Sequence, residues 1–187
     1  MRKSIVSFWR REDAAISTET VIIMPILFVT LILSFTFFDA FRRYNLSLKA
    51  AYTIGDILSR RPIVTAWDFE GLANLYEFLT FENGEPWLRY SEVRRGDVGY
   101  EVEWSYATDG NAVRDTNSIS ALLACMPVMA VGERVIVVET YSTYTPPLNI
   151  ELPTQNFENI IVTRHRFASF LEFDQSVALP AAPVGTY

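Results

Sequence analysis

The longest apolar run in the chain extends from Ile16 to Phe38 and predicts a transmembrane helix. Apart from Glu19, the run contains only apolar residues, Ser, Thr and Pro25. About 20 mostly apolar residues in a helix suffice to cross a bilayer, and the run exceeds the apolar core of a cleaved secretory signal. Apolar residues at helical spacing continue to about Ser59, at Leu46, Ala50, Ile54, Ile57 and Leu58. We therefore expect one helix whose first half lies in lipid and whose second half packs on a soluble domain.

Beyond Pro62, the pattern predicts a second helix and then a β-hairpin. Thr65 and Asp68 have the spacing of a capping pair at the start of a helix. Asn83-Gly84 is a turn-forming pair and is expected to end this helix. The apolar face of this helix comprises Leu72, Leu75, Tyr76 and Leu79. The predicted hairpin has strands at Leu88–Arg94 and Val98–Ala107, joined at Arg95-Gly96-Asp97. In its second strand the residues expected on the buried face are Val98, Tyr100, Val102, Trp104 and Tyr106.

The rest of the chain predicts a short helix at Thr116–Met126 and two further strands. Arg134–Thr145 is apolar on both faces and is expected to be a central strand, and Asn159–Phe170 is expected to be the last one. The predicted fold class is α+β, a long N-terminal transmembrane helix followed by short helices and a roughly four-stranded antiparallel sheet. The expected segments are a basic leader at 1–14, the helix at 15–60, the domain at 61–176 and a flexible tail at 177–187.

The distribution of charged residues bears on the partners of the chain and on its orientation in a membrane. From Asp39 to Tyr187 the chain holds 12 Lys and Arg against 19 Asp and Glu, a net charge of −7. This acidic balance argues against nucleic acid as a partner. Arg2, Lys3, Arg10 and Arg11 precede the apolar run, which favours a cytoplasmic N-terminus and a domain outside the cytoplasm, although cations follow the run as well.

Residue types that usually carry catalysis or bind metals are sparse. The single His165 lies between two arginines in a predicted strand, and we expect it to be structural. The single Cys125 ends an apolar segment, so a buried, inert thiol is expected, with an intermolecular disulfide as the alternative. Glycine-rich phosphate loops and metal-spaced His or Cys sets are missing from the sequence, so neither a cofactor nor a metal is expected. The tripeptide Arg95-Gly96-Asp97 resembles a cell-attachment motif but is typical of a hairpin turn.

Glu19 has two interpretations. A carboxylate near the end of a membrane helix can extend to the lipid headgroups without a further role. Alternatively, cleavage between Ala14 and Ala15 would make Glu19 the fifth residue of the mature chain and create an ammonium group on Ala15. Glu19 of a neighbouring, staggered helix could then pair with that ammonium and fix the register of the two helices. Pro25 is either an ordinary membrane proline or part of the same pattern, and it is expected to kink or loosen the helix.

The segment REDAAISTETVIIMPILF, with Ala14-Ala15, Glu19 and Pro25, resembles the N-terminus of the TadE/TadF-like pseudopilins of the tight-adherence (Flp-type IV) pilus system. A second segment, from Gly132 through Glu139 and on to Pro146, resembles the C-terminal strand of that family. Two departures from the family are Ala14, where prepilins usually have Gly, and Thr20, where the family often has Phe.

The resemblance implies a minor pilin-like subunit without enzymatic activity, held in the inner membrane with its domain in the periplasm. Its implied partners are a prepilin peptidase, other pilin-like subunits, the Tad inner-membrane assembly proteins and the lipid bilayer. Two other interpretations remain. One is a single-pass membrane protein that keeps its leader and uses its outer domain as a scaffold or ligand-binding module. The other is a membrane-tethered enzyme, which the sparse catalytic residues disfavour.

Overall fold

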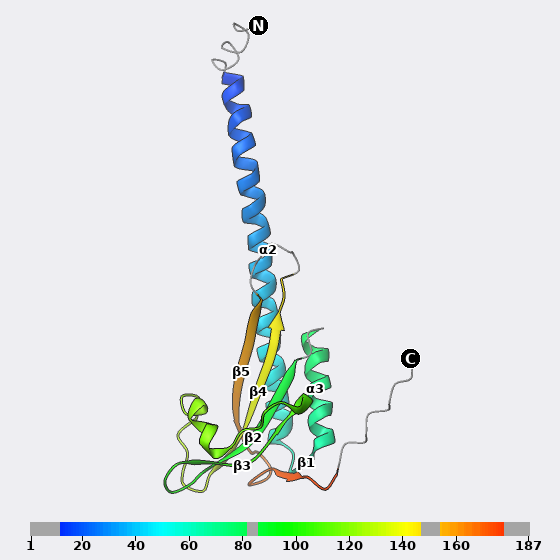
Figure 1. The fold of residues 1–187 in the computed structure, drawn as a ribbon, viewed down its shortest axis with the longest axis vertical. Coiled ribbons are helices and arrows are strands. Elements are labelled where there is room, and N and C mark those ends of the chain that lie inside the picture. Colours follow the sequence, from blue (N-terminus) through cyan, green and yellow to red (C-terminus); the bar gives the residue numbers. More distant parts are fainter. Residues whose placement is uncertain (1–11, 82–85, 147–153, 178–187) are drawn as a thin grey trace, which may run out of the picture. The chain divides into compact units, whose positions relative to one another are not determined.

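The computed structural model describes residues 12–81, 86–146 and 154–177, with the backbone alone for 12–18. The chain divides into two units, residues 1–42 with 146–150 and residues 43–145 with 151–187. Helix α2 (Glu12–Ser59) begins in the first unit and ends in the second (Figure 1). The single long helix predicted from the apolar pattern is therefore confirmed.

Polar groups within the apolar part of α2 bond to the helix itself. The Thr30 hydroxyl donates to the Ile26 carbonyl at 2.8 Å, and the Thr36 hydroxyl donates to the Ile32 carbonyl at 3.0 Å. Such bonds satisfy hydroxyl groups that an apolar environment would leave unpaired. The helix continues through Pro25, although a proline at this position removes one backbone donor. Hydroxyl groups therefore add little polarity to this part of α2.

In the second unit, the short strand β1 (Ile63–Thr65) leads into helix α3 (Ala66–Thr80). The Asp68 carboxylate accepts from the Thr65 backbone N–H at 2.9 Å, and the Thr65 hydroxyl accepts from the Asp68 N–H, which confirms the predicted capping pair. Burial raises the pKa of Asp68, but the bonds to Thr65 and Arg61 outweigh it and leave the pKa below its usual value. The helix ends at Thr80, and the predicted stop at Asn83-Gly84 lies outside the described residues.

Replacing Thr65 by Ala is expected to lower the free energy of unfolding by about 1 kcal/mol, because the first turn of α3 loses its cap. Urea unfolding of the full chain in detergent micelles, followed by tryptophan fluorescence, measures the change. Thr53→Ala is the control, since the Thr53 hydroxyl donates to the Lys49 carbonyl within α2 and caps no helix start. An equal loss in both variants would contradict the capping argument.

Four antiparallel strands form the main sheet in the order β3-β2-β4-β5. Their bounds are β2 Trp87–Arg95, β3 Tyr100–Ala107, β4 Arg134–Tyr144 and β5 Gln155–Arg164. Strand β4 pairs with β2 on one side and with β5 on the other, so the predicted central strand is confirmed.

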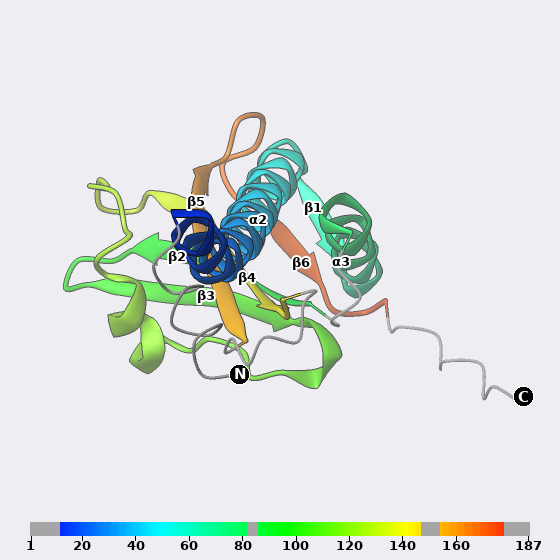
Figure 2. The same cartoon turned by 90° about the horizontal axis from the view of Figure 1, so that it is seen from above.

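Each face of the sheet has its own core because successive side chains of a strand point to opposite faces. Ile136 and Val138 of β4 pack with residues of α3 and of the C-terminal part of α2; Figure 2 shows these two helices along one side of the sheet. Val135 and Val137 of β4 pack instead with Ile119 and residues around it. Both faces of β4 are thus buried, which explains its continuous apolar sequence.

A polar link crosses the helix-facing core. The Ser47 hydroxyl of α2 lies 2.6 Å from the Tyr76 hydroxyl of α3, and the Asn159 amide of β5 donates to Ser47 at 2.6 Å. The same amide donates to the Thr140 hydroxyl of β4 at 3.2 Å. All four groups are buried and bonded, as interior polar groups must be. The link therefore joins both helices to two strands.

The short helix predicted at Thr116–Met126 is present as the 3₁₀ helix η2 (Thr116–Leu122), which ends before the predicted boundary; its start is capped by Asp115 and Ser118. The predictions for the end of the chain were wrong in detail. The last long strand is β5, which starts before Asn159 and ends at Arg164, where the chain turns. Residues beyond the turn form β6 (Glu172–Asp174), which pairs in parallel with β1, an arrangement that the pattern did not predict.

Val98 is fully exposed, because β3 begins only at Tyr100 and leaves Val98 in the turn. The prediction that placed Val98 on the buried face is therefore wrong. Of the predicted tail at 177–187, only Val177 belongs to the described residues.

Candidate functional site

The apolar part of α2 exposes its side chains along its length. Large apolar residues from Val21 to Phe41 have exposed fractions between 37% and 75%. By length and composition this helix is apolar enough to cross a membrane. Within the first unit, the described part of α2 is therefore an open apolar surface for lipid or for other apolar helices.

Glu19 is exposed at the start of this apolar surface. Among the described residues, none forms an ion pair with it. Ala14 and Ala15 lie within the first turn of α2, and only their backbone is described. Helix ends open more readily than helix interiors, so the bond between these two alanines lies where the helix is weakest.

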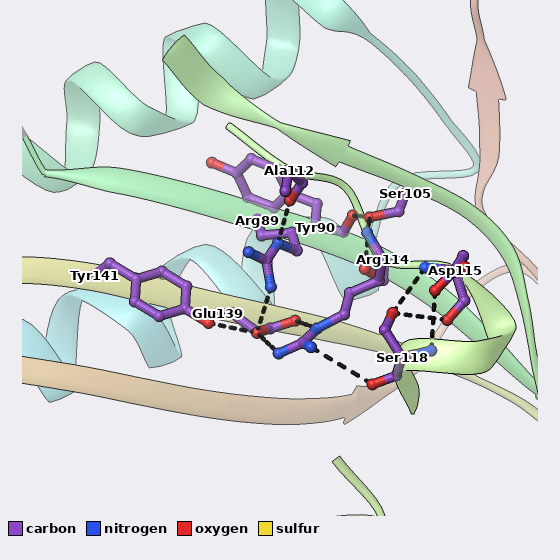
Figure 3. A network of polar contacts seen from close by, with 10 residues as sticks. Arg89, Tyr90, Ser105, Ala112, Arg114, Asp115, Ser118, Glu139 and Tyr141 are labelled. Atoms are coloured by element: carbon purple, nitrogen blue, oxygen red, sulfur yellow. Dashed lines mark hydrogen bonds and ion pairs between the residues drawn. The ribbon is translucent and has the colours of Figure 1, made fainter. Parts of the chain in front are cut away.

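Glu139 of β4 is fully buried in the centre of a polar network (Figure 3). Arg114 donates to both carboxylate oxygens, from Nε to Oε1 at 2.9 Å and from Nη2 to Oε2 at 2.7 Å. Arg89 donates to Oε2 from Nη1 at 3.1 Å, and the Tyr141 hydroxyl donates to it at 2.7 Å. Four donated bonds occupy the carboxylate, which leaves it little capacity to act as a general base.

The elements around Glu139 explain how its two arginines reach it. Arg89 of β2 lies directly opposite Glu139 of β4 in the sheet register. Arg114 lies between the 3₁₀ helices η1 (Thr108–Gly110) and η2, and its backbone N–H donates to the Ser105 hydroxyl at 3.0 Å. The network therefore fastens the segment from η1 to η2 onto the sheet.

Charge and burial shift the pKa values within this network in consistent directions. Hydrogen bonding to Glu139 raises the pKa of Arg114 above its usual value. Burial, and then the bond to Glu139, raise the pKa of the Tyr141 hydroxyl. Both residues therefore keep their protons at neutral pH. The two guanidinium groups next to one carboxylate leave the centre with one net positive charge.

Gly132, which lies just before β4, has a positive φ of 87°. The Glu133 N–H donates to the Ala130 carbonyl at 3.0 Å, so Gly132 occupies the third position of a turn. A positive φ at that position is the signature of a type II turn, which favours glycine. Gly132 also donates to the Arg95 carbonyl at 2.7 Å, which ties the turn to the end of β2.

His165 and Glu92 form a second buried polar cluster. His165 Nε2 lies 3.1 Å from Glu92 Oε1, and the two side chains are 4% and 1% exposed. Glu92 also accepts from the Trp104 indole at 2.8 Å and from the Leu171 N–H at 3.2 Å. His165 lies just after β5 and not within it, and these contacts hold the turn beyond that strand against β2.

The prediction of a buried thiol was wrong, because Cys125 is free and exposed. The chain leaves the 3₁₀ helix at Leu122, so residues 123–125 lie at the surface. Arg95-Gly96-Asp97 forms part of a hairpin turn, in which the Gly96 N–H donates to the Gly99 carbonyl at 2.8 Å. Within residues 12–81, 86–146 and 154–177, no group of His, Cys, Asp or Glu has an arrangement suited to a metal ion.

Comparison with known proteins gave no relatives. No family model, no curated protein and no solved structure matches the chain.

Proposed function

We propose that the chain is a pilin-like minor subunit of the TadE/TadF type, which supports the assembly of a tight-adherence Flp pilus and thereby surface adherence. The observation that supports this best is Glu19, exposed at the start of an exposed apolar helix. The same helix ends in the core of an α+β unit. A helix of this kind can anchor a domain in the inner membrane and afterwards pack against the helices of other subunits.

In this proposal, the prepilin peptidase cleaves between Ala14 and Ala15, and the domain faces the periplasm. Glu19 of one subunit then pairs with the ammonium group of Ala15 on a neighbour. Each group would otherwise be an unpaired charge in an apolar bundle, so the pair fixes the register of the helices. The Tad inner-membrane proteins and sibling subunits are the partners in assembly.

Replacing Glu19 by Ala is expected to reduce the number of pili by more than about tenfold, since breaking a buried charge pair costs about 3–5 kcal/mol. Membrane insertion should be unchanged because the substitution makes the helix more apolar. Pili are counted by electron microscopy in cells that carry the remaining pilus genes, and membrane fractionation checks insertion. Ser34→Ala, at another exposed position of α2, is the control. Normal piliation with Glu19→Ala would contradict the pairing.

The second candidate function is a single-pass membrane protein with an uncleaved leader and a ligand-binding outer domain. A hollow of about 260 Å³ at the ends of β4 and β5 favours this alternative; it is lined by Trp87, Tyr141, Ser142, Thr143, Asn156, Phe157 and Glu158. N-terminal sequencing from cells that hold the peptidase separates the two functions. A mature chain that starts at Ala15 supports the pilin-like subunit, and an intact Met1 supports the alternative.

A further inference from the structure

Five exposed residues of helix α3 and its end form one line along the outer side of the helix. We call them the α3 seam: Trp67, Gly71, Asn74, Phe78 and Phe81. Their alternating spacings of four and three residues keep them within about 80° of arc and are typical of helices that pack in pairs. Phe81 directly follows the helix, and its ring centre lies 6.3 Å from that of Phe78, so the seam extends to the end of α3. Figure 2 shows α3 at the rim of the second unit, with the sheet and the C-terminal part of α2 to one side of it.

Three aromatic rings supply most of the apolar area of the seam. Trp67, Phe78 and Phe81 are 55%, 72% and 70% exposed, although Leu72 and Tyr76 of the same helix are buried in the core. An aromatic side chain has about 200 Å² of surface, so the three rings offer about 400 Å² per chain. Two such faces together bury about 800 Å², less than the roughly 1,200 Å² at which standard interfaces begin. An interface of this size is typical of reversible association.

The middle of the seam is narrow and polar. A Cβ atom added at Gly71 would meet no atom within 4 Å, so a second helix can approach the backbone of α3 closely at this point. Asn74 is exposed, and an asparagine at a single position of a helix seam fixes the register and the number of the paired helices. Both features suit a second copy of α3 that runs parallel to the first. Gly71 then faces Gly71, and the amides of the two Asn74 side chains can bond to each other.

The charges of α3 favour a parallel pair over an antiparallel one. Helix α3 contains Asp68, Glu70 and Glu77 but neither Lys nor Arg. Beside an antiparallel copy, Glu70 would lie next to Glu77 of that copy, and like charges so placed destabilise a helix pair. Beside a parallel copy, Glu70 lies next to Leu75 of that copy instead. A basic peptide would gain little from this surface, because Asp68 and Glu70 are already bonded within the chain.

We propose that the α3 seam is the interface of a reversible, parallel dimer of this chain. Each seam residue then faces the same residue of the second copy, and the two-fold axis runs along the paired helices. The rings of Trp67, Phe78 and Phe81 are removed from water in the dimer, and the pair of Asn74 side chains keeps the two helices level. This inference does not depend on the proposed role in pilus assembly.

Single cysteines in the full-length chain test the dimer. Gly71→Cys is introduced together with Cys125→Ser, and disulfide formation between chains in detergent micelles is followed on non-reducing gels. The expected rate is at least about tenfold higher than in a control chain with Val113→Cys and Cys125→Ser, because pairing raises the local concentration of the thiols. Val113 is 58% exposed and lies outside α3, so the control chain measures random collisions and any association through other surfaces.

Two further experiments test the direction of the pair and the role of Asn74. In a mixture of Gly71→Cys and Phe78→Cys chains, both with Cys125→Ser, disulfides are expected between like chains; faster formation of the mixed disulfide would indicate an antiparallel pair and overturn the proposal. Asn74→Asp, added to the Gly71→Cys chain, places two carboxylates face to face and is expected to slow disulfide formation to the control rate, with an unchanged circular dichroism spectrum. Equal rates for the Gly71 and Val113 chains would overturn the proposal. Sedimentation of the unmodified chain as a monomer at every concentration would also overturn it, because the seam would then bind a different protein.

Discussion

Replacing Glu139 by Gln is expected to lower the free energy of unfolding by about 3–5 kcal/mol, the usual cost of removing one partner from a buried ion pair. The side chain of Glu139 is 0% exposed, and those of Arg89 and Arg114 are 10% and 15% exposed. A neutral amide would leave two nearly dry guanidinium groups without a counter-charge. Urea unfolding of the full chain in detergent micelles, followed by tryptophan fluorescence, measures the loss.

The control for this prediction is Glu101→Gln in the neighbouring strand β3. Glu101 pairs with Arg94 at 2.5 Å, but the two side chains are 45% and 39% exposed. An ion pair that water reaches contributes about 0–1 kcal/mol. Equal losses of stability for Glu139→Gln and Glu101→Gln would show that burial does not determine how much the Glu139 network contributes to the free energy of unfolding.

A triple variant distinguishes an unpaired charge from a simple loss of packing. Glu139→Leu, Arg89→Met and Arg114→Met together remove every charge of the network and keep much of its volume. Because apolar side chains can replace a buried ion pair at little cost, this variant is expected to lose less stability than Glu139→Gln alone. If the triple variant loses as much stability as the single variant, or more, then the packing and geometry of these side chains contribute more to stability than the pairing of their charges.

The elements that follow a strong local pattern were predictable from the sequence. Helix α2 and strand β4 have long apolar patterns, and the capping pair of α3 is a local motif. The parallel pair of β1 and β6 was not predictable in this way. Each strand has only three residues, and the partners are far apart in the chain, so their pairing depends on tertiary packing.

The Glu139 network was predictable only in part. A carboxylate that follows the run Val135–Val138 in a central strand must be buried, and a buried carboxylate requires a cation. The register of β2 against β4 could have identified Arg89 as its neighbour. Arg114 lies in an irregular segment between two short 3₁₀ helices, where no periodicity indicates which way a side chain points.

Replacing Phe69 by Ala is expected to lower the free energy of unfolding by about 3–5 kcal/mol, the range for a buried phenylalanine. Phe69 of α3 is fully buried. Its ring is stacked on two others, at centroid distances of 4.5 Å to Tyr90 and 5.1 Å to Tyr106. The rings of Trp104 and Phe173 lie 5.6 Å and 5.3 Å away. The cavity would therefore open where α3, β2, β3 and β6 meet, and urea unfolding measures the loss.

Phe167→Ala is the matched control for Phe69→Ala, because it removes the same side chain from a position that is 76% exposed. Surface substitutions of this kind usually change stability by about 0.5 kcal/mol or less. A loss in Phe69→Ala no larger than in Phe167→Ala would mean that the surrounding rings close the cavity. Three of the four rings around Phe69 are themselves held by hydrogen bonds, from Tyr90 to the Phe69 carbonyl, from Trp104 to Glu92 and from Tyr106 to Glu70. Since these bonds restrain the rings, the cavity is expected to persist and the full cost to be measured.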